Sequence, residues 1–200
     1  MTAEPARQRL WLQFVNTDTA GQAHDSDQIR DFESLLAWLV RNSAVDDERA
    51  ASIRRRAMLQ PAAAAATLAD VRRVRSALRL LAERGAQQPQ VREDAVTEMN
   101  RVLGRSAGAR RVELDADGHY TRCFVPTGDA FAGLLIPIVE SAADSLIDEE
   151  LTRVRRCADP RCRRVFLDTT KNGRRRWCAM GTCGNRAKAA RHRARLARSH

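Results

Sequence analysis

The chain has 200 residues, which is the size of one domain or of one domain with an appendage. Its hydrophobic fraction of 44% supports a buried core, and its aromatic fraction of only 4% means that aliphatic side chains must fill that core. No apolar run approaches the roughly 18–20 residues that span a bilayer, and the first residues show no signal-peptide pattern. We therefore expect a cytoplasmic protein without a membrane segment. Five cysteines in such a chain favour a metal site or free thiols over a disulfide framework.

The net charge of +10 is unevenly distributed along the chain. Residues 151–200 contain 16 basic and 2 acidic side chains and so carry +14, whereas residues 1–150 carry −4. Four of the five cysteines lie in the basic part, and Cys123 stands apart from them. Both observations predict a domain boundary between residues 150 and 151. We expect Cys123 to be a small buried apolar side chain.

The first 150 residues have mainly helical patterns. An apolar segment at residues 11–15 is too short to assign. Apolar side chains at helical spacing, together with capping and breaking residues, predict helices over residues 27–40, 46–59 and 91–103, and a further helix that opens at Pro61 and has Gly85 as its C-cap. The first of these is expected to begin at Ser26 or Asp27, as the N-cap.

A different pattern follows these helices. Alternation with period two predicts a β-hairpin of residues 111–114 and 120–125, with a turn at residues 115–118. Residues 129–147 return to a helical pattern, in which Pro137 should produce a kink or a break. The expected fold class is thus mainly α with a small β-hairpin.

The helical domain shows no catalytic motif of a hydrolase, a metalloprotease or a nucleotide-binding enzyme. Its clustered carboxylates stand at the ends of expected helices, where capping accounts for them. We therefore expect no catalytic residue and no enzymatic activity. The helices could enclose a pocket for a small-molecule effector or form the interface of a homodimer.

The four cysteines of the basic part form two pairs with the same spacing. Four residues separate the members of each pair, and fifteen residues separate the pairs; the cysteines are Cys157, Cys162, Cys178 and Cys183. Four thiolates bind Zn²⁺ tetrahedrally, and closed sites of this kind are structural. Because the segment has few apolar residues, it should fold only with the metal. Two disulfides or reduced thiols are the alternatives.

The residues around these pairs predict how the segment folds. The Asn172-Gly173 turn signal lies between residues 164–167 and 175–177, which predicts a hairpin of these two segments. A helix over about residues 184–198 should follow the second pair. Phe166 and Trp177 should form a small core beneath the metal. The whole order is like that of a treble clef, so we expect a treble-clef-like Cys₄ zinc finger in residues 151–200.

Residues 157–193 resemble the CGNR zinc finger. The resemblance rests on Cys183-Gly184-Asn185-Arg186, on Phe166-Leu167-Asp168-Thr169-Thr170 and on Arg175-Arg176-Trp177-Cys178-Ala179-Met180. The first 150 residues resemble the ABATE-type domain that usually precedes this finger, through Phe14-Val15-Asn16-Thr17 and the domain order. The resemblance implies a prokaryotic, stress-linked transcription regulator with the four cysteines as zinc ligands and no catalytic residue.

The basic side chains of the finger suit a nucleic-acid partner. An array of cations held by a metal-fixed scaffold neutralises phosphates and releases counterions, and Arg can also read guanine in the major groove. We expect double-stranded DNA to contact Arg174, Arg175, Arg176, Arg186, Lys188, Arg191, Arg193 and Arg195. Asn185 is expected to cap the helix or support a turn. The alternatives are a zinc module that binds RNA or ribosomes and, less favoured, an enzyme with a structural zinc finger.

If the two parts are independent, replacing one zinc ligand should affect only one of them. Cys178→Ser is then expected to unfold the chain beyond about residue 155 and to leave most of the helicity of residues 1–150 in place. Circular dichroism measures this difference, and a collapse of the whole helical signal would show one cooperative unit.

Overall fold

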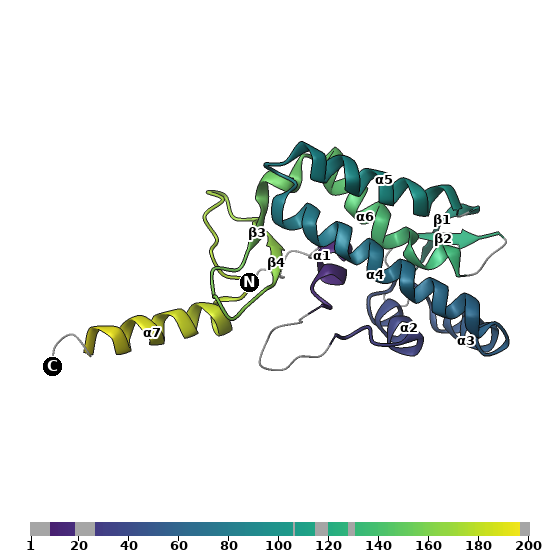
Figure 1. Ribbon diagram of the computed structural model, residues 1–200, viewed down its shortest axis with the longest axis horizontal. Coiled ribbons are helices and arrows are strands. Elements are labelled where there is room, and N and C mark those ends of the chain that lie inside the picture. Colours follow the sequence, from purple (N-terminus) through teal and green to yellow (C-terminus); the bar gives the residue numbers. More distant parts are fainter. Residues whose placement is uncertain (1–8, 19–26, 106, 115–119, 128–130, 197–200) are drawn as a thin grey trace.

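Helices dominate the structure and two short antiparallel hairpins complete it (Figure 1). The computed structural model describes residues 9–18, 27–105, 107–114, 120–127 and 131–196. The elements before the cysteine-rich segment are α1 (Leu10–Val15), α2 (Phe32–Arg41), α3 (Asp47–Leu59), α4 (Pro61–Arg84), α5 (Pro89–Arg105), β1 (Gly108–Leu114), β2 (Tyr120–Pro126), η1 (Ala132–Leu135) and α6 (Ile136–Ile147). The elements after them are η2 (Glu150–Arg153), β3 (Val154–Arg156), β4 (Val165–Leu167), η3 (Met180–Gly184) and α7 (Asn185–Leu196).

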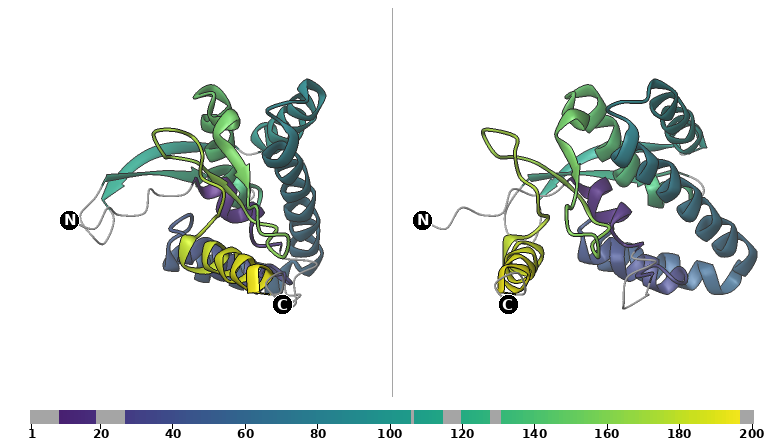
Figure 2. Two further views of the ribbon diagram at one scale, coloured as in Figure 1. Left: turned by 90° about the vertical axis from the view of Figure 1, so that its left-hand side faces the viewer. Right: turned by 60° about the vertical axis from the view of Figure 1, so that its left-hand side comes forward.

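The shortest α-helix, α1, lies at the centre of the molecule (Figures 1 and 2). It packs against α4 and α6 on the body side and against β4 on the other side. Four of its apolar side chains, Trp11, Leu12, Phe14 and Val15, are completely buried, and Leu10 is half-buried. An isolated helix of six residues is unstable in water, so packing must hold α1 in its helical form. The segment that the sequence left unassigned is thus the centre of the core.

The capping pattern explains where α2 begins. The carboxylate of Asp31 accepts a hydrogen bond from the backbone N–H of Ser34 at 2.8 Å, and the Ser34 hydroxyl accepts one from the N–H of Asp31 at 3.0 Å. This capping box starts the helix at Phe32. The expected N-cap at Asp27 is therefore wrong, and Ser26 lies outside the described residues. Asp27 instead pairs with Arg75, a contact between distant segments that helical spacing does not reveal.

The next two helices agree with their sequence signals. Asp46 caps α3 through the backbone N–H of Arg49 at 2.7 Å, and Pro61 opens α4. Gly85 follows the last residue of α4 as its C-cap. α5 extends slightly beyond the expected residues 91–103 at both ends.

The hairpin and the last helix of the body are also confirmed. β1 and β2 pair antiparallel from Gly108 opposite Pro126 to Leu114 opposite Tyr120, while the turn at residues 115–118 and the side chain of Cys123 lie outside the described parts. The break expected at Pro137 occurs, because the 3₁₀ turn η1 ends at Leu135 and α6 starts with this proline in its first turn. Within the described residues, no helix combines the length and the apolar character needed to cross a bilayer.

The first finger strands are joined directly to the helical body. The side chain of Asn16, at the end of α1, donates to the carbonyl of Val165 at 2.8 Å and accepts from its N–H at 2.9 Å. Val165 belongs to the body core and is completely buried. Arg79 of α4 adds hydrogen bonds to the carbonyls of Val15 at 2.9 Å and of Arg163 at 2.8 Å. The strand β4 is therefore fixed to the body by both apolar packing and backbone hydrogen bonds.

A partly buried ion pair supports the residue next to this joint. Arg75 of α4 is almost completely buried and donates to the hydroxyl of Thr17 at 2.9 Å and to the carboxylate of Asp27 at 2.7 Å. Burial, the largest single cause, would raise the pKa of Asp27, but the hydrogen bonds from Arg75 and from the N–H of Ile29, together with the nearby positive charges, lower it overall. The charged pair therefore fixes the chain that leaves α1.

The joint predicts that Asn16→Ala destabilises the protein. The substitution leaves the N–H and the carbonyl of Val165 buried without partners, which should lower the free energy of unfolding by about 2–4 kcal/mol. Urea denaturation of the zinc-loaded protein measures the change. The matched control is Asn100→Ala on the exposed face of α5, for which we expect a change within about 0.5 kcal/mol. Equal effects of the two substitutions would contradict the role of Asn16.

The same joint changes the expectation for Cys178→Ser. Because Val165 fills part of the body core, unfolding the finger should also lower the melting temperature of the helices. A body that melts at an unchanged temperature would contradict this coupling.

Candidate metal centre and nucleic-acid interface

The first cysteine pair lies in the loop between β3 and β4. These strands pair antiparallel, with Val154 opposite Leu167 and Arg156 opposite Val165. The N–H of Cys157 donates to the carbonyl of Arg164 at 2.9 Å, and the N–H of Cys162 donates to the carbonyl of Asp159 at 2.8 Å. The hairpin expected from residues 164–167 and 175–177 is therefore wrong, because β4 pairs with the strand before it.

A buried carboxylate explains why residues 175–177 form no strand. Asp168 is completely buried and accepts hydrogen bonds from the N–H of Thr170 at 3.0 Å and the N–H of Arg175 at 2.8 Å. Burial would raise the pKa of Asp168, but the hydrogen bonds from Thr170 and Arg175 lower it. The turn at Asn172-Gly173 does form, with Gly173 at φ +60°. It belongs to a loop folded around Asp168 rather than to a β-hairpin.

The second cysteine pair stands at the start of α7. Cys178 precedes η3, a single π-helical turn, and Cys183 lies inside it. The side-chain amide of Asn185 donates to the carbonyl of Gly181 at 3.0 Å, which agrees with the turn role expected for this residue. The second metal-binding segment therefore leads directly into the helix.

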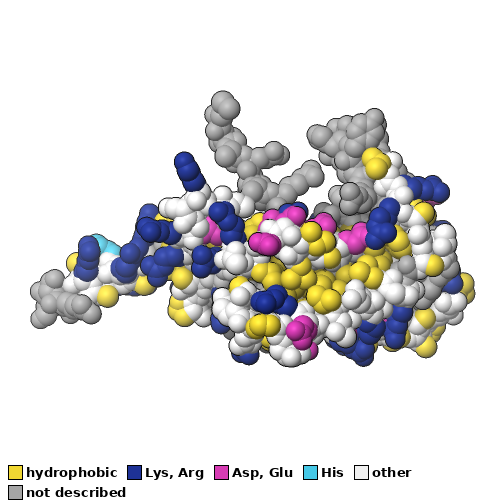
Figure 3. Space-filling view, turned by 90° about the horizontal axis from the view of Figure 1, so that it is seen from above, with side chains coloured by type: hydrophobic (Ala, Val, Ile, Leu, Met, Phe, Trp, Pro, Cys, Tyr) yellow, Lys and Arg dark blue, Asp and Glu magenta, His cyan; other side chains and the backbone are white. Residues whose placement is uncertain are grey.

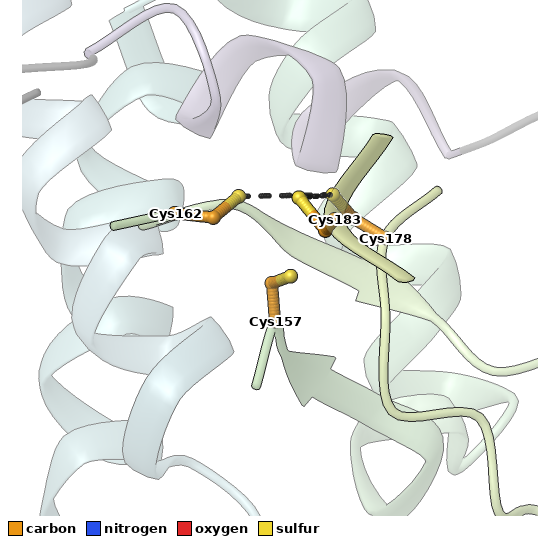
Figure 4. Close-up of side chains that lie close together, drawn as sticks. All are labelled: Cys157, Cys162, Cys178 and Cys183. Carbon is orange, nitrogen blue, oxygen red and sulfur yellow. Dashed lines mark hydrogen bonds between the residues drawn. The ribbon is translucent and has the colours of Figure 1, made fainter. Parts of the chain in front are cut away.

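The four sulfur atoms point toward one another (Figure 4). All four lie within 4.8 Å of each other. The Sγ atom of Cys178 lies 3.7 Å from the Sγ of Cys162 and 3.7 Å from the Sγ of Cys183. A tetrahedral ion with Zn–S bonds of about 2.3 Å requires sulfur separations of about 3.8 Å. A disulfide requires about 2.05 Å, and the four cysteines are free. Their geometry and chemistry fit a structural zinc ion, held by all four expected ligands.

Arg186 lies against this cluster. Its guanidinium donates to Sγ of Cys183 at 3.1 Å and to the carboxylate of Asp159 at 2.8 Å. The hydrogen bond to the Cys183 sulfur is the main cause that raises the pKa of Arg186. Asp159 is buried, and burial would raise its pKa, but the N–H of Arg161 and the Arg186 guanidinium lower it. Because four thiolates exceed the charge of one Zn²⁺, this arginine offsets part of the excess negative charge at the metal.

Arg175 also supports the finger from within. Its Nε donates to the carbonyl of Trp177 at 2.9 Å, and its Nη2 donates to the carbonyl of Cys178. Its guanidinium lies 4.8 Å from the centre of the Phe166 ring. Phe166 and Trp177 pack with the cysteines as the expected small core. The contacts of Arg175 thus connect that core to the second cysteine pair.

The remaining candidate residues present their charges to solvent. Arg174 and Arg176 lie on the loop before Cys178, and Arg176 packs over the Trp177 ring at 5.3 Å. The exposed basic residues of α7 besides Arg186 are Lys188, Arg191, Arg193 and Arg195. No residue of α7 is buried. α7 extends away from the helical body (Figure 1), and Lys and Arg side chains gather along the arm that it forms (Figure 3).

Asp159 and Asp168 are structural residues of the site that the sequence analysis did not single out. They are the two acidic residues among 16 basic ones in residues 151–200. That isolation is a usable signal, because a lone carboxylate in a strongly basic segment is well placed to organise its surroundings. Asn16 gave no such local signal, since its partner Val165 is 149 residues away.

Arg186→Ala should weaken zinc retention by about 10–100-fold, because it removes the hydrogen bond to Cys183 and leaves Asp159 without its cation. Competition with a chromophoric chelator measures the affinity. Arg191→Ala on the same helix is the matched control and should retain zinc like the unmodified protein. Equal zinc loss in both variants would show that Arg186 has no special role at the metal.

Zinc affinity should fall as the pH falls. Burial is the main cause that raises the pKa of Cys178, and the neighbouring Cys162 adds to it, so the metal-free cluster holds protons that zinc must displace. Each proton released should change the affinity by about tenfold per pH unit. Chelator competition at several pH values tests this, and an affinity independent of pH would contradict thiolate ligation.

Comparisons with known protein families agree with this architecture. The family model ABATE, described as "Putative stress-induced transcription regulator", matches residues 8–149, and the model of the CGNR zinc finger matches residues 153–196. A search of curated proteins found no match. Because the first model alone covers more than half of the chain, the protein belongs to the ABATE family, with a CGNR zinc finger after the ABATE region.

Proposed function

We propose that this protein is a transcription regulator that binds double-stranded DNA through its zinc finger, and that its helical body senses a small molecule or forms a dimer. The ABATE description and the Cys₄ site support a regulator with a zinc module. Both matching families are of the regulator or zinc-finger type, which supports a role without catalysis.

The observation that carries the proposal is the character of α7. The helix has twelve residues, of which five are Arg or Lys, none is acidic and none is buried. A helix of this length is marginal on its own, and repulsion between neighbouring cations weakens it further. It contributes no side chain to the body core. Such a helix suits contact with a polyanion, whose phosphates relieve the repulsion and release counterions on binding.

The zinc site supplies the rigidity that this contact requires. The structural zinc ion, when bound, holds two separate segments together at the start of α7. Cys183 lies two residues before the helix, and Arg186 in its first turn returns to Cys183 and Asp159. The direction of the helix is therefore fixed at its first turn, which limits the entropy lost on binding.

The eight expected contact residues divide into two groups by their surroundings. Arg175 and Arg186 use their guanidinium groups inside the finger, so we assign them a supporting role. The proposed phosphate or base contacts are Arg174, Arg176, Lys188, Arg191, Arg193 and Arg195.

Salt dependence tests the electrostatic part of the proposal. If five of these side chains contact phosphates, a plot of log K against log salt for duplex DNA should have a slope near −4.5, since each contact contributes about −0.9. Lys188→Gln and Arg191→Gln should each reduce the magnitude of the slope by about 0.9. Arg55→Gln on the exposed face of α3 is the matched control and should leave the slope unchanged. A flat salt response contradicts the proposal, and a preference for structured RNA in competition would favour the RNA-binding alternative.

A further inference from the structure

A polar cavity lies where the helical body meets the finger. It has a volume of about 200 Å³ and is bordered by the ends of α1 and α2 and by the residue before β4. Besides Trp38, its lining consists of two arginines and four amide side chains, namely Arg41, Arg164, Gln13, Asn16, Gln28 and Asn42. No Asp or Glu is among its lining residues in the described part of the chain. The cavity therefore offers hydrogen-bond donors and positive charge without a carboxylate.

The two arginines differ from the ion-paired arginines of the body. Arg9, Arg54, Arg75, Arg101 and Arg110 each form an ion pair with a carboxylate. Within the described residues, neither Arg41 nor Arg164 makes such a pair, and both side chains are exposed. The C-terminal end of α2 stabilises Arg41. The helix end does not stabilise the charge of Arg164, which lines the same cavity from the finger.

Two guanidinium groups beside one polar cavity suit an oxyanion. Arginine binds carboxylate and phosphate through paired N–H donors, and such charge-assisted hydrogen bonds are the strong ones. Gln28 can donate a further hydrogen bond to the same group, whereas the amides of Asn16 and Asn42 already donate to the carbonyls of Val165 and Trp38. The volume admits inorganic phosphate or a short carboxylate and is too small for a nucleotide.

A larger cavity of about 410 Å³ lies beside α4, α5 and η1 and is a competing candidate. Its arginines include Arg101 and Arg105, and both already pair with Asp70, while Arg101 also pairs with Glu98. Their charges are thus largely neutralised within the protein. The smaller cavity, whose arginines pair with no carboxylate in the described part of the chain, is therefore the better site for an anion.

The position of the smaller cavity connects it with the finger. Asn16 lines it and at the same time binds Val165, the residue that follows Arg164. The carbonyl of Arg164 accepts the N–H of the zinc ligand Cys157. An anion held by Arg41 and Arg164 would therefore contact both the body and the finger hairpin that carries the first cysteine pair.

We propose that this cavity binds a small oxyanion, a phosphate or a carboxylate, between Arg41 of the body and Arg164 of the finger. The site deepens the proposed sensing role of the helical body, on which it rests, by giving the chemical class of the ligand. Binding stabilises the body–finger contact, since the anion joins a cation of the body to a cation of the finger.

Calorimetry on the full zinc-loaded chain tests the site. Inorganic phosphate and acetate are titrated separately, at constant ionic strength set with chloride, so that the two kinds of oxyanion are distinguished. We expect saturable binding of at least one of them. Arg41→Gln and Arg164→Gln should each weaken it by about tenfold or more, because each removes a charge-assisted hydrogen bond.

Matched controls separate the site from general charge effects. Arg55→Gln in α3 and Arg156→Gln in β3 each remove an exposed positive charge from the same two parts of the chain and should leave anion binding unchanged. Slower hydrogen exchange of β4 with the bound anion would support the bridging role. Absence of saturable binding, or an equal loss in all four variants, overturns the proposal.

DNA binding is measured separately on the same proteins. Anion binding without DNA binding would reject the DNA-binding function and keep this site. DNA binding without anion binding would reject this site alone.

Discussion

The pair of hydrogen bonds between Asn16 and Val165 is the contact on which the arrangement of the molecule depends. It joins the end of the central helix α1 to the strand that follows the first cysteine pair. One side of this contact is the body core, in which Trp11, Leu12, Phe14 and Val15 of α1 are completely buried. The other side is the hairpin that presents Cys157 and Cys162 to the metal. Because a buried backbone N–H and carbonyl are both satisfied there, the body and the finger cannot separate without exposing unpaired polar groups.

The two carboxylates of the finger, Asp159 and Asp168, are buried, whereas its described basic side chains are exposed to solvent. Asp159 accepts hydrogen bonds beside the first cysteine pair, and Asp168 organises the loop before the second. Arg175 and Arg186 turn inward to backbone carbonyls, an aromatic ring, a cysteine sulfur and Asp159. These internal contacts hold a fold with a very small apolar core. The remaining basic side chains among the proposed contacts lie exposed on one helix and one loop.

Local signals predicted much of this structure, and distant contacts account for what they missed. Helical periodicity and caps placed α3 and α4, and the repeated cysteine spacing identified all four sulfur ligands. Asp27 looked like a helix cap because the sequence does not show that Arg75 lies beside it. The Asn172-Gly173 signal correctly indicated a turn, but the strand pairing failed because Asp168 binds the N–H of Arg175. The cavity between Arg41 and Arg164 joins segments more than 120 residues apart, so no local pattern could predict it.

The anchoring of α7 at one end has a mechanical consequence. A helix of twelve residues is about 18 Å long, and none of its side chains is buried along that length. It therefore behaves as a lever whose pivot is the metal-binding segment. A rotation of about 10° at the pivot would move the far end by about 3 Å, which is close to the rise of one base pair along a DNA strand. Small changes where the hairpin meets the body can thus become a displacement of this size at the tip of the helix.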